Sequence, residues 1–200
     1  AVGIESSPDL VSARKVAKEI GFELKEIIID ENDIIQALPV QTKIIREFKP
    51  KSVDVSFNLP IYFVCKHAKE KNIVVCQGPD SMLGGYRRYS KMSEAQAKEE
   101  MKRETDLFFH RDLLENNATA SYFGKKLFMP YIDEKIMNFC FNLDYEFRRN
   151  KFILRKLGEK LGLKEETCAR EKQACQYGSG IMKIMIKLTK KKGIHIRDYL

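Results

Sequence analysis

The sequence is poor in several features that mark particular classes of protein. It has no tryptophan, only three histidines, and no apolar run approaching the ~20 residues of a membrane-spanning helix. Its five cysteines are scattered and form no CxxC pair, so neither a zinc site nor a disulfide framework is indicated. We therefore expect reduced thiols, a cytoplasmic location and no engagement with a membrane.

The remaining composition is that of an ordinary folded protein. Hydrophobic residues make up 44% of the 200 residues and charged residues 32%, and no low-complexity segment argues for disorder. The length suits one globular domain. The chain starts at Ala1 inside an apolar stretch that we interpret as a strand already under way, so we expect an N-terminally incomplete fragment.

The formal net charge of +8 raises the question of a nucleic-acid partner. The densest cationic run, residues 190–192, follows apolar positions at helical spacing within residues 181–188. This pattern is typical of the solvated end of an amphipathic helix, where positive charge also suits the helix dipole. Nucleic acid is therefore not the expected partner.

Short β-rich runs alternate with helical patterns over residues 1–90. Such alternation is typical of βαβ units and predicts an α/β fold with a doubly wound parallel sheet. Asp9 is positioned to cap a helix that ends at Ile20, before Gly21. The predicted strands span 2–5, 24–29, 53–56 and 73–76, and further helices span 32–48 and Pro60 to 71.

After Tyr89 the strand patterns vanish and helical patterns continue to the C-terminus. The sequence therefore predicts a largely helical C-terminal half. We treat residues 1–200 as one domain with an α/β nucleotide-binding part at 1–90 and a helical part at 91–200. The helices predicted in the second part span 93–109, 133–141, 151–161 and 177–191.

The segment VVCQGPDSMLGGYRRY, residues 74–89, is the most informative in the chain. It follows a predicted strand, and ligands of parallel sheets bind beyond the carboxyl ends of the strands. Its glycines let the backbone approach a ligand closely. Asp80 supplies a hard oxygen ligand of the kind that Mg²⁺ prefers when it bridges to phosphates.

The full string resembles the asparagine synthetase family pattern S-G-x-G-x-D-E-x-x-G-G-Y. The resemblance implies an ATP-pyrophosphatase domain with a fold similar to the adenine nucleotide alpha hydrolases, with ATP and Mg²⁺ as cofactors. It implies a catalytic and metal-binding role for Asp80, which would hold Mg²⁺ and pyrophosphate. It further implies contacts with ATP or pyrophosphate for Gln77, Gly78, Gly84, Gly85 and Tyr86. The segment VGIESSPDLVSARKVAKEIG, residues 2–21, is similar to the family segment that borders the adenine of ATP, and this similarity makes Val2, Gly3 and Ile4 neighbours of the nucleotide. Arg170 is assigned to the same site by a later matching segment.

Two later segments extend the resemblance. KFILRKLGEKLGL, residues 151–163, is similar to the family's K-x-x-L-R element. CAREKQACQYGSG, residues 168–180, resembles the R-x-K stretch that precedes a glycine-containing loop. The resemblance makes Lys172 the residue that steadies developing charge while the acyl-adenylate is attacked, a task that suits a compact ammonium group.

The sequence also departs from the family pattern. The family's S-G-G-x-D-S phosphate loop would lie upstream of Ala1, so we expect this chain by itself to be inactive. Ser81 stands where the family has Glu, and Val75 where it has Ser. Lys126 and Phe128 replace a charged pair, which argues that the substrate pocket has been rebuilt.

The preferred hypothesis is an ATP-dependent amide-forming ligase that activates aspartate or a related acid as its acyl-adenylate, with release of AMP and pyrophosphate. Nitrogen would come from ammonia, an amine or a separate glutaminase, and a homodimer is compatible with the sequence. One alternative is a non-catalytic nucleotide-binding module. The other is a tRNA-modifying ATP-pyrophosphatase, which would use the positive charge of the chain.

Overall fold

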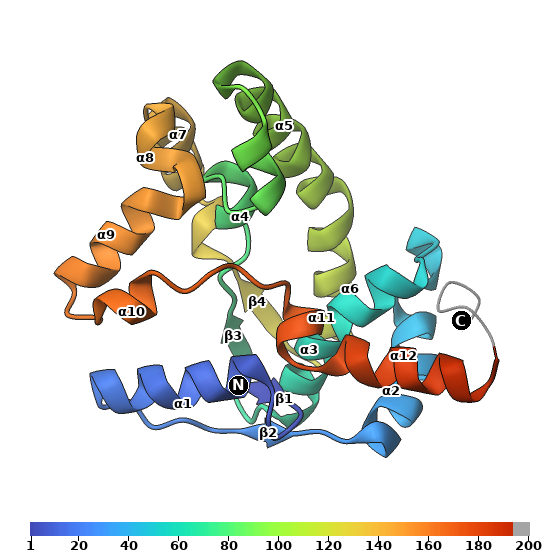
Figure 1. Cartoon of the computed structure of the whole chain (residues 1–200). Helices are drawn as coiled ribbons and strands as arrows, with labels where there is room; N and C mark the ends of the chain where they lie inside the picture. The colour runs from blue at the N-terminus through green and yellow to red at the C-terminus, as the bar shows by residue number, and fades with distance from the viewer. Residues whose placement is uncertain (194–200) are drawn as a thin grey trace. The chain divides into compact units, whose positions relative to one another are not determined.

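The computed structural model describes residues 1–193, which form two compact units (Figure 1). Unit 1 contains residues 1–71, 115–126 and the described residues from 173 onward. Unit 2 contains residues 72–114 and 127–172. The described residues are mostly helical with two small sheets, a composition that is compatible with an α/β fold of the nucleotide-hydrolase type.

Unit 1 is built from a pair of parallel strands and several helices. In the pair, Val2 lies opposite Ile27 and Gly3 opposite Ile28, so the first two predicted strands are present in shorter form. The elements are β1 (Val2–Gly3), α1 (Pro8–Ile20), β2 (Ile27–Ile28), α2 (Glu31–Ile44), η1 (Arg46–Phe48), α3 (Ser52–His67), most of α6 (Leu113–Tyr122), α11 (Cys175–Gly178) and α12 (Ile181–Lys191).

Helix α1 confirms the predicted helix but not its predicted cap. Ser7, rather than Asp9, has the extended backbone of an N-cap, and its Oγ accepts from the Leu10 N–H at 3.5 Å. The reason is that Pro8 already occupies the first helical position, so the cap must precede it. Gly21 ends the helix with φ +68°, as predicted.

Helix α3 corrects two predictions at once, because the predicted strand at 53–56 and the predicted helix start at Pro60 both lie inside this one helix. The Lys51 N–H donates to Asp54 Oδ2 at 2.8 Å, which helps to begin the helix well before the proline. Val55, Leu59 and Phe63 recur every four residues and are fully buried. Helical burial thus outweighs both the β-rich composition and the cost of an internal proline.

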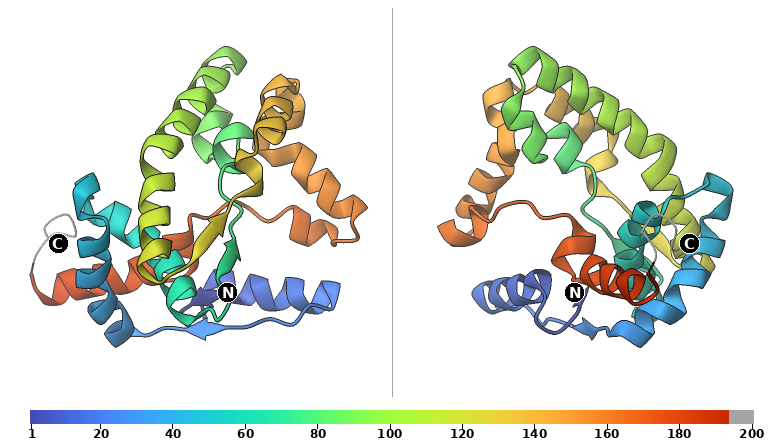
Figure 2. Two further views of the ribbon diagram at one scale, coloured as in Figure 1. Left: turned by 180° about the vertical axis from the view of Figure 1, so that it is seen from behind. Right: turned by 45° about the vertical axis from the view of Figure 1, so that its right-hand side comes forward.

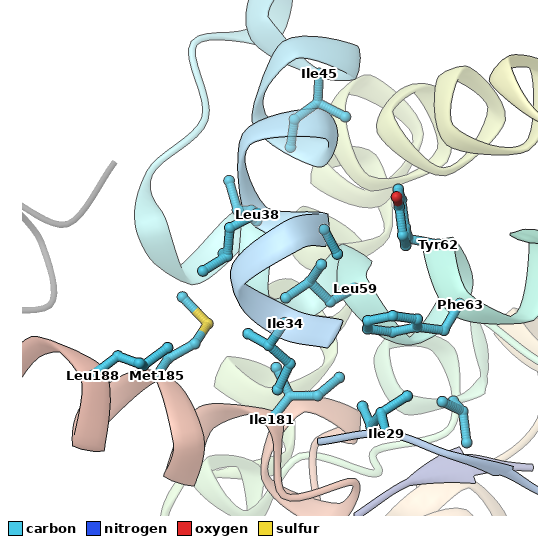
Figure 3. Close-up of a cluster of buried hydrophobic side chains, with 13 residues drawn as sticks. Ile29, Ile34, Leu38, Ile45, Leu59, Tyr62, Phe63, Ile181, Met185 and Leu188 are labelled. Carbon is cyan, nitrogen blue, oxygen red and sulfur yellow. The ribbon is translucent and has the colours of Figure 1, made fainter. Parts of the chain in front are cut away.

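A single apolar cluster forms the core of unit 1, where α2, α3 and α12 bring their buried faces together around the strands (Figure 3). This continuous burial gives the unit its main source of stability. The buried members are Val2, Ile29, Ile34, Ala37, Leu38, Ile45, Val55, Leu59, Tyr62, Phe63, Ile181, Met185 and Leu188.

Unit 2 contains the remaining elements, and in it α4 packs against α5 and α8 against α9 (Figure 2). Strand β4 pairs with β3, so the part of the chain after Tyr89, which is largely helical as predicted, also contains one short strand that the sequence did not indicate. The three-residue β4 is too short for a period-2 pattern to reveal it. The elements are β3 (Asn72–Val74), α4 (Pro79–Met82), η2 (Arg87–Lys91), α5 (Glu94–Leu107), η3 (Phe108–Asp112), β4 (Lys126–Phe128), η4 (Pro130–Ile132), α7 (Glu134–Asn142), α8 (Tyr145–Arg148), η5 (Arg149–Lys151), α9 (Phe152–Lys160) and α10 (Glu165–Cys168).

The long helices of unit 2 follow the sequence pattern closely. α5 begins at a reciprocal cap, in which Ser93 Oγ accepts from the Gln96 N–H and Gln96 Oε1 accepts from the Ser93 N–H. The helices predicted at 93–109, 133–141 and 151–161 correspond to α5, α7 and α9. Among residues 1–193, no helix combines the length and the apolar character needed to cross a membrane.

Candidate functional site

The glycine-rich turn predicted from residues 74–89 lies in unit 2, directly after β3. Gly78 has φ +105° and Gly84 has φ +63°, conformations that side-chain-bearing residues rarely adopt. Between these two glycines, α4 carries Asp80 in its first turn. Ser81 Oγ donates to the Gly78 carbonyl at 3.0 Å, so this hydroxyl helps to close the turn.

The backbone approaches Asp80 most closely at Gly85. The Gly85 N–H donates to the Asp80 carbonyl at 2.8 Å. A Cβ placed on Gly85 would lie 2.9 Å from Asp80 Cα and 3.0 Å from its Cγ, which is too close for a real side chain. Position 85 therefore has to be glycine for Asp80 to keep its place.

Two ammonium groups flank the Asp80 carboxylate. Lys151 Nζ lies 2.9 Å from Oδ1, and Lys172 Nζ lies 3.5 Å from Oδ2. All three side chains are largely shielded, with exposed fractions of 24% for Lys151, 21% for Lys172 and 30% for Asp80. Because two cations share one carboxylate, the cluster carries an excess positive charge that would attract an anion.

Lys151 reaches this cluster through an unusual stretch of backbone. Asn150 and Lys151 have φ of +53° and +56°, so two adjacent residues with side chains are left-handed. The Lys151 N–H donates to the Leu83 carbonyl at 2.7 Å, and the Asn150 N–H donates to the Gly84 carbonyl at 3.1 Å. These bonds dock the start of α9 onto the glycine-rich turn and hold Lys151 beside Asp80.

Tyr86 provides an aromatic wall to the same cluster. Lys172 Nζ lies 5.1 Å from the ring centroid and Arg88 Cζ lies 4.5 Å from it, both within the range of cation–π attraction. Burial, reinforced by the negative charges of Asp80 and Glu104, raises the pKa of Tyr86 to about 12. The phenol is therefore neutral at pH 7.

A cavity of about 250 Å³ opens next to these residues within unit 2. Several of its lining residues are cationic, whereas Glu171 is the one acidic residue among them. A cavity with this balance favours an anionic ligand. Its lining residues are Gly84, Gly85, Tyr86, Arg87, Tyr89, Ser90, Arg149, Asn150, Arg155, Ala169, Glu171 and Lys172.

The structure brings together five of the predicted site residues. Asp80 and Lys172 form the ion pair, Gly85 supports Asp80, and Gly84 and Tyr86 line the cavity. Sequence resemblance placed these five in one site although Lys172 is far from the others along the chain. Their chemical roles stay predictions.

None of the other six predicted site residues lines the cavity, and one of them, Gly78, directly precedes α4, the helix that carries Asp80. Val2, Gly3 and Ile4 belong to unit 1, where the Ile4 N–H donates to a carbonyl of the turn before α12 at 2.9 Å. Gln77 and Arg170 belong to unit 2 but are not among the residues that line the cavity. The contacts with ATP predicted for these residues stay predictions.

Sequence reasoning assigned no site role to Lys151 or Arg155, which the structure places at Asp80 and at the cavity. The available signal was the K-x-x-L-R resemblance, whose first and last positions are these two residues. That motif marks both residues as candidates, although Lys151 itself directly precedes α9 and has a left-handed backbone. The left-handed backbone at Asn150 has no comparable signature.

The protein oxygens available for a metal ion at this site are few. Among residues 1–193, no group of three or more His, Cys, Asp or Glu side chains is arranged to hold a metal ion. Asp80 supplies one hard ligand, and its charge is balanced by the two lysines. Since Mg²⁺ is commonly held by one or two carboxylates plus substrate phosphates, Asp80 fits an ion that arrives together with a nucleotide.

Comparison with known proteins gives one consistent result. A family model described as asparagine synthase matches residues 1–105 and 90–191. Glutamine-hydrolysing asparagine synthetases of Gallus gallus and Homo sapiens are each 30% identical to this chain, over 194 residues (92% of the chain) and 189 residues (89%).

A Methanocaldococcus jannaschii protein, whose name gives glutamine-hydrolysing asparagine synthetase as a provisional assignment, is 26% identical over an alignment of 235 residues and 96% of the chain. The matched region is 34% of the Gallus gallus protein, 33% of the Homo sapiens protein and 43% of the Methanocaldococcus jannaschii protein. The chain therefore spans less than half the length of these relatives.

Proposed function

Because this chain belongs to the asparagine synthetase family, we propose that it forms part of an ATP-dependent carbon–nitrogen ligase. A carboxylate would attack ATP to give its acyl-adenylate and pyrophosphate. Ammonia or an amine would then attack the acyl carbon and release AMP. The observation that carries the proposal is the Asp80 carboxylate held between the ammonium groups of Lys151 and Lys172.

The two lysines support this chemistry through their charge. Adenylation leaves negative charge on pyrophosphate, and attack on the acyl-adenylate creates an oxyanion, so each step gains from fixed positive charge in a shielded site. We assign Lys172 to stabilise the charge that develops at the acyl group and phosphates. Lys151 holds the same carboxylate from the other side and adds to the positive potential.

Asp80 is the residue that we expect to hold Mg²⁺ when Mg²⁺–ATP binds. The bound ion would neutralise phosphate charge and orient the nucleotide. Lys151 and Lys172, which flank Asp80, would contribute positive charge next to the phosphate oxygens of a bound nucleotide. Gly85, by leaving room for Asp80, keeps this carboxylate in position.

The proposed acid substrate is aspartate or a related acid, because the relatives of known name are asparagine synthetases. The cationic residues that line the cavity suit an anionic substrate. Those relatives are named as glutamine-hydrolysing, so we propose that nitrogen reaches the site as ammonia from glutamine, through the same protein or a separate glutaminase. An amine substrate is the alternative donor.

The wider architecture completes the proposal. We propose that residues 1–200 belong to one synthetase domain whose strands are part of a doubly wound parallel sheet, with an α/β part to residue 90 and a helical part beyond it. Val2, Gly3 and Ile4 would border the nucleotide, and Gln77, Gly78 and Arg170 would contact its phosphates. The intact protein is expected to work in the cytoplasm.

The decisive test measures release of pyrophosphate and AMP by the intact protein with ATP, Mg²⁺, aspartate and ammonia. We expect both products in equal amounts. Lys172→Ala should lower kcat by about 10²–10³-fold, the usual loss when a group that stabilises transition-state charge is removed. Asp80→Asn should lower pyrophosphate release and raise the Mg²⁺ concentration needed for it.

A matched control is Lys160→Ala, which removes an exposed lysine at the end of α9 in the same unit and should leave kcat unchanged. Full activity of Lys172→Ala would remove the proposed role of that residue. If aspartate and a panel of other acids all give neither product, the ligase proposal is wrong, and a non-catalytic nucleotide-binding function takes its place.

A further inference from the structure

Arg155 makes an unusual set of contacts beside the cavity. Its Nε donates to the Asn150 carbonyl at 2.8 Å, and its Nη2 donates to Asn150 Oδ1 at 3.2 Å. Its Nη1 donates to the carbonyls of Cys168 and of Arg170, the latter at 3.0 Å. In the described part of the chain its acceptors are all uncharged oxygens, so Arg155 ties main-chain segments together instead of pairing with an acid.

The segments that Arg155 joins are those that deliver the two lysines. Asn150 directly precedes Lys151, and Arg170 lies two residues before Lys172. One planar guanidinium therefore bonds to the backbone next to both ammonium groups that flank Asp80. The segment around Arg170 has no regular structure between α10 and α11, so it depends on such bonds for its position.

We propose that Arg155 is a positioning residue that sets how far Lys151 and Lys172 stand on either side of Asp80. Its catalytic consequence rests on the proposed function, because the lysine spacing matters only if both act on phosphates. Guanidinium suits the task since its donors diverge in a rigid plane and reach two segments at once. A lysine ammonium, as a single point, cannot bridge Asn150 and Arg170 in this way.

The proposal predicts a local effect on the segment that carries Lys172, independent of any activity. Removing a charged hydrogen-bond donor leaves the carbonyls of the 168–172 segment without these bonds, so this segment should open more often. We expect backbone amides of residues 169–172 to exchange with deuterium at least about tenfold faster in Arg155→Ala than in the native protein. Amides of α5 should exchange at the native rate.

Lys156→Ala is the matched control, because Lys156 is the neighbouring cation on α9 and contacts Glu159 and the Phe152 ring instead of the 168–172 segment. Its exchange pattern should be native. Equal exchange of residues 169–172 in Arg155→Ala and in the native protein would overturn the proposal. If Arg155→Ala fails to fold by circular dichroism, Arg155→Lys carries the same comparison.

Kinetic measurements on Arg155→Ala distinguish a role in positioning the two lysines from a role in the general stability of the fold. In the intact protein we expect Arg155→Ala to lower kcat for pyrophosphate release by about 10²-fold with little change in KM for ATP, the size expected for a misplaced catalytic group. Millimolar guanidinium chloride should raise the kcat of Arg155→Ala at least about tenfold, since the free ion has the same planar donors. Methylammonium chloride, a point cation, should not restore it.

The outcomes distinguish the two proposals. Equal restoration by methylammonium, or a kcat within about twofold of the native value, would overturn the positioning role. If the intact protein releases no pyrophosphate at all, the proposed function fails, but the deuterium-exchange comparison still decides whether Arg155 orders the segment. Faster exchange together with guanidinium-specific rescue would support both.

Discussion

The two units of this chain are stabilised in different ways. Unit 1 has one continuous apolar cluster drawn from α2, α3, α12 and the strands, whereas unit 2 has two small clusters around Met82 and Tyr89. In unit 2, hydrogen bonds from Arg148 and Arg155 to main-chain carbonyls fix the positions of loops. The candidate site lies in the unit with the smaller apolar core.

Arg148 shows the character of unit 2 most clearly. Its side chain is 3% exposed, and burial lowers its pKa. Nε donates to the Met82 carbonyl at 3.0 Å, Nη2 approaches Met101 Sδ at 3.3 Å, and the Phe141 ring lies against the guanidinium. Burying a cation among neutral groups lowers the free energy of unfolding. We therefore infer that Arg148 fixes the turns of unit 2 at the expense of stability.

The largest effect should come from the core of unit 1. Phe63→Ala removes a fully buried ring from the centre of that cluster and should lower the free energy of unfolding by about 3–5 kcal/mol. Phe22→Ala is the control, because Phe22 is 66% exposed in the same unit and its loss should cost less than about 0.5 kcal/mol. Urea unfolding of both variants measures the difference, and similar losses would contradict the assignment of the core.

The second-largest effect concerns thiol reactivity, which should differ between a cysteine of unit 1 and a cysteine of unit 2. Burial raises the pKa of Cys65 in unit 1 to about 11, whereas Cys76 in unit 2 is exposed. The raised pKa leaves Cys65 with less thiolate near pH 8 and burial restricts access to it, so Cys65 should react with iodoacetamide at least about tenfold more slowly than the exposed Cys76. Peptide mass spectrometry over time measures both rates. Equal rates would mean that Cys65 is accessible in solution.

Gly85→Ala tests the packing of unit 2 at the site itself. The added Cβ meets the backbone and carboxylate of Asp80, which cannot move freely, so we expect a loss of about 1–3 kcal/mol. Gly158→Ala in α9 is the matched control, since its Cβ meets only the side-chain ends of Cys168 and Leu163. That loss should be smaller because alanine also favours the helix. Thermal unfolding that ranks the two variants in the opposite order would count against the Asp80 geometry.

The smallest effect concerns an exposed ion pair of unit 1. Hydrogen bonds from Lys187 and Lys191 to Glu31 lower the pKa of this carboxyl below 4.5. A lowered pKa contributes stability that is present above the unfolded value and lost as pH falls through the folded value. Glu31→Gln should therefore reduce the fall in Tm between pH 5 and pH 3, at low salt only. An unchanged acid profile would show that the contact adds nothing.

Much of this fold follows from local patterns, and the exceptions are instructive. Gly21 ended α1 and Ser93 began α5 as their residue types predict. The strand predicted at 53–56 is wrong because the four-residue spacing of Val55 and Leu59, which the sequence already contains, favours a helix more strongly than the β-branched residues favour a strand.

The site could be predicted only in part. The motif indicated the glycine-rich turn and the place of Asp80 in it, and resemblance added Lys172, but the close contact of Gly85 with Asp80 was not predicted. The contacts of Lys151 and Arg155 depend on a left-handed turn at Asn150 and on chain segments about 15–70 residues apart, which local propensity does not encode.

Gly85 also limits which amino-acid substitutions this protein can accept during evolution. No single-base change in a glycine codon leads to another residue that lacks a Cβ, so every amino-acid replacement reachable in one step brings an atom into the space occupied by Asp80. A compensating change would have to move α4 or shorten Asp80, and either would disturb the carboxylate that the two lysines share. Lineages that retain this carboxylate geometry are therefore expected to retain glycine at position 85.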